Sequence, residues 1–154
     1  MKQEDKELLL KDLCARLPYG VMLKHISTEK PFNLFSFKRD EYVSYKEDGV
    51  ELAVDGIYYD WVVNNIYHNI GTYIKPYLRP MSSMTTEEIC KLENIIGGGF
   101  TYRGGTLTLN TEEIIRLPIY KISNLIQFIY SRHLDLNNLI PMGLALEAPE
   151  GMYR

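Results

Sequence analysis

The sequence predicts an α+β fold: an N-terminal helix, an antiparallel β-meander of four or five strands, and then helices packed with a short extra strand. Three observations predict it. Leucines recur at helical spacing before Pro18, short β-type runs alternate with turn residues up to Val63, and a helix-start signal lies at Thr85. The chain has 154 residues, of which 45% are hydrophobic and 24% charged, so it can bury one core. We expect a single domain over residues 1–154, with parts at 1–20, 21–73 and 74–154.

The first element is expected to be a helix over Glu4–Arg16. Leu9, Leu10 and Leu13 fall on one face, and acidic residues at the start favour the positive end of the helix dipole. Pro18 ends this helix, and Tyr19-Gly20 turns the chain.

The meander is predicted from short runs rich in β-branched and aromatic residues. Turn residues such as Asp48-Gly49 separate these runs, which is a hairpin signal. The runs are Val21–Ile26, Phe32–Phe37, Tyr42–Lys46, Val50–Val54 and Ile57–Val63.

The segment Lys75–Pro80 has prolines four positions apart. Each proline lacks a backbone donor, so we expect an extended segment that is excluded from a central strand. We interpret it as a buried structural crossover between the meander and the helical part, and not as a proline-type docking peptide.

The second helix has the clearest start in the sequence. Thr85 and Glu88 match a capping box, and Met84 and Ile89 a hydrophobic staple. Gly97 should end this helix with a left-handed turn.

The C-terminal third is expected to contain a strand at Thr106–Leu109 and a helix from about Pro118 to Arg132. An apolar stripe predicts that helix: Ile119, Ile122, Leu125, Ile126 and Ile129. Asp135 should cap one more turn through Ile140, and the tail from Leu144 should be partly docked by Leu144 and Leu146 and loose thereafter.

Charge and cysteine content restrict the expected partners. The net charge is −3 and the basic residues are scattered, so nothing favours nucleic acid as a partner. No apolar run is long enough to span a bilayer and no signal peptide is evident, which favours a cytoplasmic protein. Cys14 and Cys90 are expected to be buried small hydrophobic residues, and no spacing typical of zinc or another cofactor is present.

The stretch Gly97–Gly105 is rich in glycine but follows a helix instead of preceding one. A phosphate loop needs the opposite order, so we interpret this stretch as a helix cap and a mobile loop. It contains Arg103, one of three arginines considered for ligand binding below.

His133 and Asp135 are the weak catalytic candidates. Neighbouring histidine and aspartate can orient one another, as a hydrolase-type enzyme requires. A histidine at a helix end beside a helix-capping aspartate explains both residues with fewer assumptions.

Twelve tyrosines against five phenylalanines is an unusual ratio. Tyrosine combines a large rigid surface with a hydroxyl, which suits a protein interface. Coverage of a thin sheet explains the same residues. The candidate contact residues lie in or beside the meander: Tyr42, Tyr45, Tyr58, Tyr59 and Trp61.

Three stretches resemble small uncharacterised proteins of Bacteroides-type gut bacteria, their prophages and mobile elements. These are Leu8–Val21 (LLLKDLCARLPYGV), Ile74–Glu88 (IKPYLRPMSSMTTEE) and His133–Tyr153, which ends in GLALEAPEGMY. The resemblance implies a bacterial or phage accessory protein in the cytoplasm, and it implies no activity, cofactor or catalytic residue.

Three functions follow as hypotheses. The first is a non-catalytic protein-binding module that uses the tyrosine-rich meander. The second is a small-ligand or nucleotide-binding protein, which requires a cavity that combines tyrosines with Arg39, Arg79 or Arg103. The third is an enzyme that uses His133 and Asp135.

Overall fold

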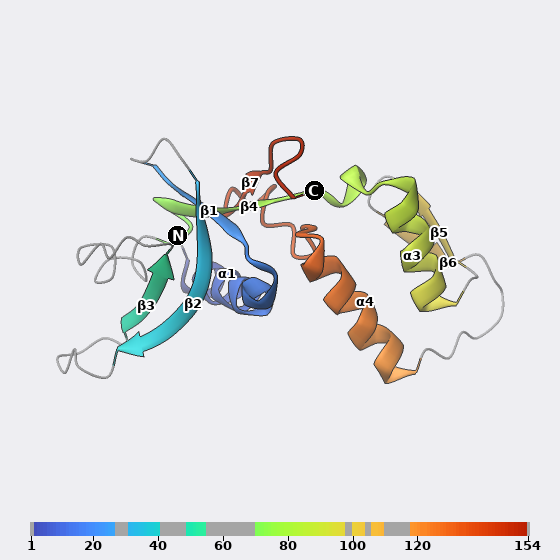
Figure 1. Cartoon of the computed structure of the whole chain (residues 1–154), viewed down its shortest axis with the longest axis horizontal. Coiled ribbons are helices and arrows are strands. Elements are labelled where there is room, and N and C mark those ends of the chain that lie inside the picture. Colours follow the sequence, from blue (N-terminus) through green and yellow to red (C-terminus); the bar gives the residue numbers. More distant parts are fainter. Residues whose placement is uncertain are drawn as a thin grey trace. The chain divides into compact units, whose positions relative to one another are not determined.

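The computed structural model describes residues 2–26, 31–40, 49–54, 70–97, 100–103, 106–109 and 118–153, whose helices and strands are labelled in Figure 1. The fold is mixed α+β, which confirms the predicted class. The chain divides into two compact units, Met1–Tyr77 with Asn137–Leu146, and Leu78–Leu136 with Glu147–Arg154. The expectation of one domain over residues 1–154 stays a prediction.

The first unit begins with helix α1 (Gln3–Arg16), at the predicted place. Leu9 and Leu13 are fully buried, as their spacing predicts. The short 3₁₀ helix η1 (Leu17–Tyr19) contains Pro18 and ends at Gly20, whose φ of 70° places it in the left-handed region.

A sheet with the strand order β3-β2-β1-β4-β7 follows. Strand β1 pairs antiparallel with β2 and β4, and β2 pairs antiparallel with β3. A consecutive meander of four or five strands is not confirmed, because β4 lies beside β1 and two predicted runs, Tyr42–Lys46 and Ile57–Val63, fall outside the described residues. The strands are β1 (Met22–His25), β2 (Phe32–Asp40), β3 (Gly49–Val54), β4 (Ile74–Leu78) and β7 (Leu146–Glu147).

The proline segment is extended, as predicted, but its exclusion from the inside of the sheet is wrong. Pro76 lies in β4 opposite Leu23 of β1, and β4 stands between β1 and β7. Strand β7 has only two residues, and the amide of Ala148 donates to the Leu78 carbonyl at 2.8 Å. The segment that contains β7 therefore contacts β4 near Leu78, at the end of β4. The backbone amide that Pro76 lacks is not required for this contact.

The second unit contains α3 (Thr86–Ile96), η2 (Met81–Ser83) and α4 (Ile119–Ser131). The predicted start and end of α3 are confirmed: Thr85 is the N-cap, and Gly97 ends the helix with a φ of 97°. Lys121 of α4 donates to the carbonyl of Ile96 at 3.1 Å, so a cation sits at the negative end of α3. The core of this unit consists of Met84, Leu92, Ile96, Ile129 and Leu134.

The glycine-rich stretch is not only a loop. Phe100–Arg103 form strand β5, which pairs antiparallel with β6 (Thr106–Leu109) from Phe100↔Leu109 to Arg103↔Thr106. The loop interpretation overlooked that a Gly-Gly pair separates two β-type runs, which is itself a hairpin signal. Strand β6 was predicted and is confirmed.

Two further predictions are wrong. No helix continues from Asp135 to Ile140 among the described residues, because Asn138 has a φ of 56°, which an α-helix does not tolerate. Cys14 and Cys90 are free and exposed, not buried, since they lie on α1 and α3 outside the buried positions of those helices.

A buried ion pair on α1 was not predicted. Asp12 and Arg16 have fully buried side chains, and the carboxylate accepts from the guanidinium at 2.6 and 3.0 Å. The amide nitrogen of Asn137 donates to the same carboxylate at 2.9 Å. The polar residues at positions 12 and 16 share one face of the helix with Leu9 and Leu13, and their charges are neutralised inside the core.

We predict that Asp12→Ala lowers the free energy of unfolding in urea by about 3–5 kcal/mol, because it leaves Arg16 buried without its carboxylate. The double variant Asp12→Ala/Arg16→Met should lose less, since no buried charge remains. Glu87→Ala is the matched control: it breaks an i,i+4 pair with Lys91 whose side chains are 78% and 47% exposed. An equal loss for Asp12→Ala and Glu87→Ala would contradict this account.

Candidate functional site

Arg79 lies where β4 ends, at a point that the backbone fixes. Its amide donates to the carbonyl of His133 at 2.8 Å, and its carbonyl accepts from the amide of Asp135 at 2.8 Å. A parallel β-bridge thus joins Arg79 to Leu134, just after α4. The guanidinium is therefore held close to both helices of the second unit.

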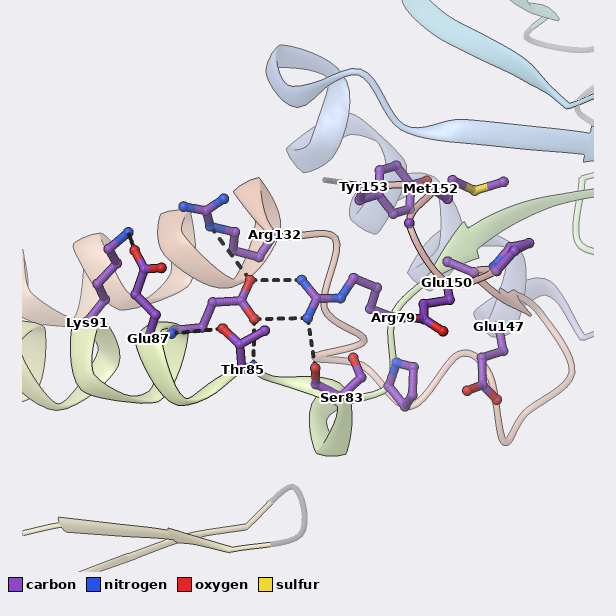
Figure 2. Close-up of a pocket in the computed structure, with 15 residues that line it drawn as sticks. Arg79, Ser83, Thr85, Glu87, Lys91, Arg132, Glu147, Glu150, Met152 and Tyr153 are labelled. Carbon is purple, nitrogen blue, oxygen red and sulfur yellow. Dashed lines mark hydrogen bonds and ion pairs between the residues drawn. The ribbon is translucent and has the colours of Figure 1, made fainter.

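The side chain of Arg79 is paired with Glu88 of α3 in a two-point contact (Figure 2). The two terminal nitrogens donate to the two carboxylate oxygens at 2.8 and 2.9 Å, and one of them also donates to the carbonyl of Ser83 at 2.9 Å. The side chains are only 17% and 10% exposed, so this pair is much less screened than a surface salt bridge.

Glu88 also completes the capping box of α3. Its carboxylate accepts from the amide of Thr85 at 2.9 Å, while the Thr85 hydroxyl accepts from the amide of Glu88 at 3.2 Å. The hydrogen bonds from Arg79, followed by that from Thr85, lower the pKa of Glu88 to about 2, against the opposing effect of burial. The same pairing raises the pKa of Arg79.

A cavity of about 540 Å³ opens beside this ion pair. One wall comes from Arg79, the α3 start and Arg132, and another from the C-terminal segment 147–153 (Figure 2). All of these residues belong to the second unit. Seven charged side chains line the cavity: Arg79, Glu87, Glu88, Lys91, Arg132, Glu147 and Glu150.

Arg132 is the cation of this cavity with the most remaining capacity to bind. Its side chain is 43% exposed, and its Nε lies 3.9 Å from the carboxylate of Glu88, too far for a hydrogen bond. The guanidinium carbon lies 5.9 Å from the centre of the Phe128 ring, which positions the side chain. Among the described residues the guanidinium of Arg132 donates no hydrogen bond.

The wall formed by residues 147–153 is attached at two places. The amide of Ala148 donates to the carbonyl of Leu78, and the ring of Tyr153 stacks on His133 with the centroids 3.8 Å apart and the planes 20° apart. The prediction that the tail is loose after Leu146 is therefore wrong, because Ala148 is bonded to Leu78 and Tyr153 is held by an aromatic contact.

The catalytic candidates lie outside this cavity. His133 and Asp135 are 4% and 5% exposed, and neither lines the cavity wall. His133 has a left-handed φ of 54° at the end of α4, and its ring packs on Tyr153. The structure thus places His133 in the attachment of the tail.

The predicted binding residues are distributed as follows. Tyr42, Tyr45, Tyr58, Tyr59 and Trp61 lie outside the described residues. Arg103 is exposed at the end of β5 and does not line the cavity, whereas Arg39 belongs to β2. Of the arginines named for a ligand site, Arg79 is in the cavity, together with Tyr153.

The sequence did not indicate that Arg132 lines a cavity, or that Arg79 pairs with Glu88. The helix-end position of Arg132 suggested only a favourable interaction with the helix dipole, and the capping box explained Glu88 without an arginine partner. The carboxylate of Glu88 can accept hydrogen bonds from the helix cap and from an arginine at the same time. Arg79 is nine positions away in the sequence, however, and no helical periodicity indicates the contact.

A second feature is an apolar surface on α4 formed by Ile119, Ile122 and Ile126, which we call the isoleucine face. These side chains are 85%, 42% and 38% exposed, whereas Ile129 on the same predicted stripe is 4% exposed. The stripe therefore predicted the helix correctly, but only its C-terminal end is buried within the structure.

Comparisons with known proteins give no match to a family model, a curated protein or a solved structure. Within the described residues, no helix has both the length and the apolar character needed to cross a membrane. No three histidine, cysteine or acidic side chains in that part of the chain are grouped as metal ligands.

We predict that Glu88 makes stability depend on pH in the acid range. Its pKa in the folded protein is about 2, below an unfolded-state value of about 4.3, so its contribution is complete above pH 4.3 and is lost as the pH falls towards 2. Glu88→Gln should lower the free energy of unfolding by roughly 2–3 kcal/mol at pH 7, and the difference from the wild type should shrink between pH 4.3 and 2.

Urea unfolding at a series of pH values measures this difference. Glu87→Gln, next to Glu88 but on an exposed pair, is the control and should show a smaller loss at pH 7. A Glu88→Gln deficit that is the same at pH 7 and pH 2 would refute the role given to this carboxylate.

Proposed function

We propose that this protein is a non-catalytic protein-binding module, an accessory protein of a phage or mobile element that acts in the cytoplasm of a Bacteroides-type bacterium. The observation that carries this proposal is the exposed isoleucine face of α4. The origin and the compartment of this proposal come from the sequence resemblance.

The isoleucine face suits a protein partner for a physical reason. Isolated apolar side chains are common on protein surfaces, but apolar residues at positions i, i+3 and i+7 of one helix form a continuous patch. Burial of such a patch contributes about 25 cal/mol for each Å² removed from water, which is the main driving force of protein association. A helix that lays such residues into an apolar groove of its partner is also a common mode of protein recognition.

We predict that Ile119→Glu/Ile122→Glu weakens binding of the native partner at least about tenfold, because it places charges where apolar contact is needed. The partner is identified by affinity purification from a Bacteroides-type host and quantitative mass spectrometry. Its affinity for the purified variants is then measured by calorimetry.

Two other variants make the test selective. Ser123→Glu/Asn124→Glu adds the same charge at exposed polar positions of α4 and should leave the affinity unchanged. Tyr58→Ala/Tyr59→Ala/Trp61→Ala tests the aromatic surface predicted from the sequence. A partner whose affinity changes with neither the isoleucine nor the aromatic variant would oppose the proposal.

A second candidate function is the binding of a small ligand in the cavity beside Arg79. The supporting observation is that Arg79 and Tyr153, an arginine and an aromatic ring of the kind expected for a ligand site, line the same cavity. Its volume of about 540 Å³ lies within the usual range for small-molecule sites, which is roughly 300–1,000 Å³.

A further inference from the structure

We propose that the cavity binds a dipolar peptide, a short extended chain with a carboxylate at one end and an ammonium or guanidinium group at the other. This inference rests on the second candidate function, ligand binding in the cavity, and does not depend on the isoleucine face. The following contacts carry it.

The charges of the cavity are separated along its length. Figure 2 places Arg132 and Lys91 at the end formed by α3 and α4, and Glu147 and Glu150 at the end formed by the C-terminal segment. Lys91 is paired with Glu87 at 2.7 Å, whereas Arg132 lies 3.9 Å from Glu88 and donates no hydrogen bond to it, so Arg132 is the cation best able to bind a further anion at this end. Glu147 is exposed and accepts no hydrogen bond from the described residues.

The middle of the cavity is electrically neutral. The terminal nitrogens of Arg79 are engaged by Glu88 and by the carbonyl of Ser83, which leaves this arginine little capacity for a further anion. A ligand that reaches both charged ends must therefore extend past the Arg79–Glu88 pair. An extended peptide suits such a ligand, because each residue adds about 3.3 Å to its length.

The same charges disfavour a nucleotide. Four glutamates and three basic side chains line the cavity, and each basic residue forms an ion pair with a glutamate, although that of Arg132 is long, at 3.9 Å. A polyphosphate would meet Arg132 alone and would be repelled by Glu147 and Glu150. A carboxylate needs only one guanidinium, which binds it through two parallel hydrogen bonds.

Binding of five probes to the full chain tests the proposal, by NMR titration at low salt. The dipolar probes are tetraglycine with free termini, and two peptides with blocked termini, lysine-glycine-glycine-glutamate and its reverse. The others are glutamine-glycine-glycine-glutamine with blocked termini and ADP. We expect at least one dipolar probe to bind with a Kd of about 1 mM or below, and at least about tenfold more tightly than the neutral peptide.

Variants test whether both charged ends of the cavity contribute to this affinity. Arg132→Gln and Glu147→Gln/Glu150→Gln should each weaken the best dipolar probe by about threefold to tenfold, and Arg132→Lys should restore only part of the loss. The controls remove equal charge from exposed positions of α1: Lys11→Gln and Glu4→Gln/Glu7→Gln should bind as the wild type. A preference for tetraglycine indicates a free peptide, and a preference for a blocked probe indicates a segment within a partner chain.

The outcomes separate the ligand class from ligand binding itself. If ADP binds more tightly than every peptide, or the neutral peptide binds as well as the dipolar ones, the dipolar ligand is refuted and the cavity function stands. Unchanged affinity in Arg132→Gln also refutes it. If no probe binds, both the inference and the second candidate function fail, while the isoleucine-face proposal is unaffected.

Discussion

The pairing of Arg79 with Glu88 connects three segments of the second unit that are separate in the sequence. The carboxylate caps the start of α3, the guanidinium extends from the end of β4, and the backbone of Arg79 is bonded to the residues that follow α4. Because both side chains are largely buried, neither charge can lose its partner without a large cost. The wall of the cavity, and the position of Arg132 beside it, depend on this arrangement.

Local chemistry explains which parts of the fold were predictable. The ends of α3 follow from Thr85, Glu88 and Gly97, because a capping box and a left-handed glycine are decided by neighbouring residues alone. The leucines of α1 and the isoleucines of α4 likewise predict helices from spacing. The spacing does not predict how much of each apolar stripe is buried, and the isoleucine face is exposed.

Features that depend on distant residues were not predictable. Pro76 is accepted inside the sheet only because the two-residue strand β7 meets β4 near Leu78, and no local pattern indicates β7. The buried carboxylate of Asp12 accepts a hydrogen bond from the side chain of Asn137, which follows 125 positions later. Of the candidate sites, Arg79 was named for a ligand, but its partner Glu88 and the nearby Arg132 become a site only through the tertiary arrangement. His133 was considered for catalysis, and its ring stacks on Tyr153.

Native-state amide hydrogen exchange of Arg79 and Asp135 tests the central claim most directly, because these amides form the backbone bonds at Arg79 and should open more readily when its side chain loses the Glu88 carboxylate. Exchange is compared between the wild type and Glu88→Gln at pH 7, with the amides of α1 in the other unit as the internal reference. The account predicts that the protection of both amides falls at least about tenfold in the variant while that of α1 is unchanged. Equal protection of Arg79 and Asp135 in the two proteins would contradict it.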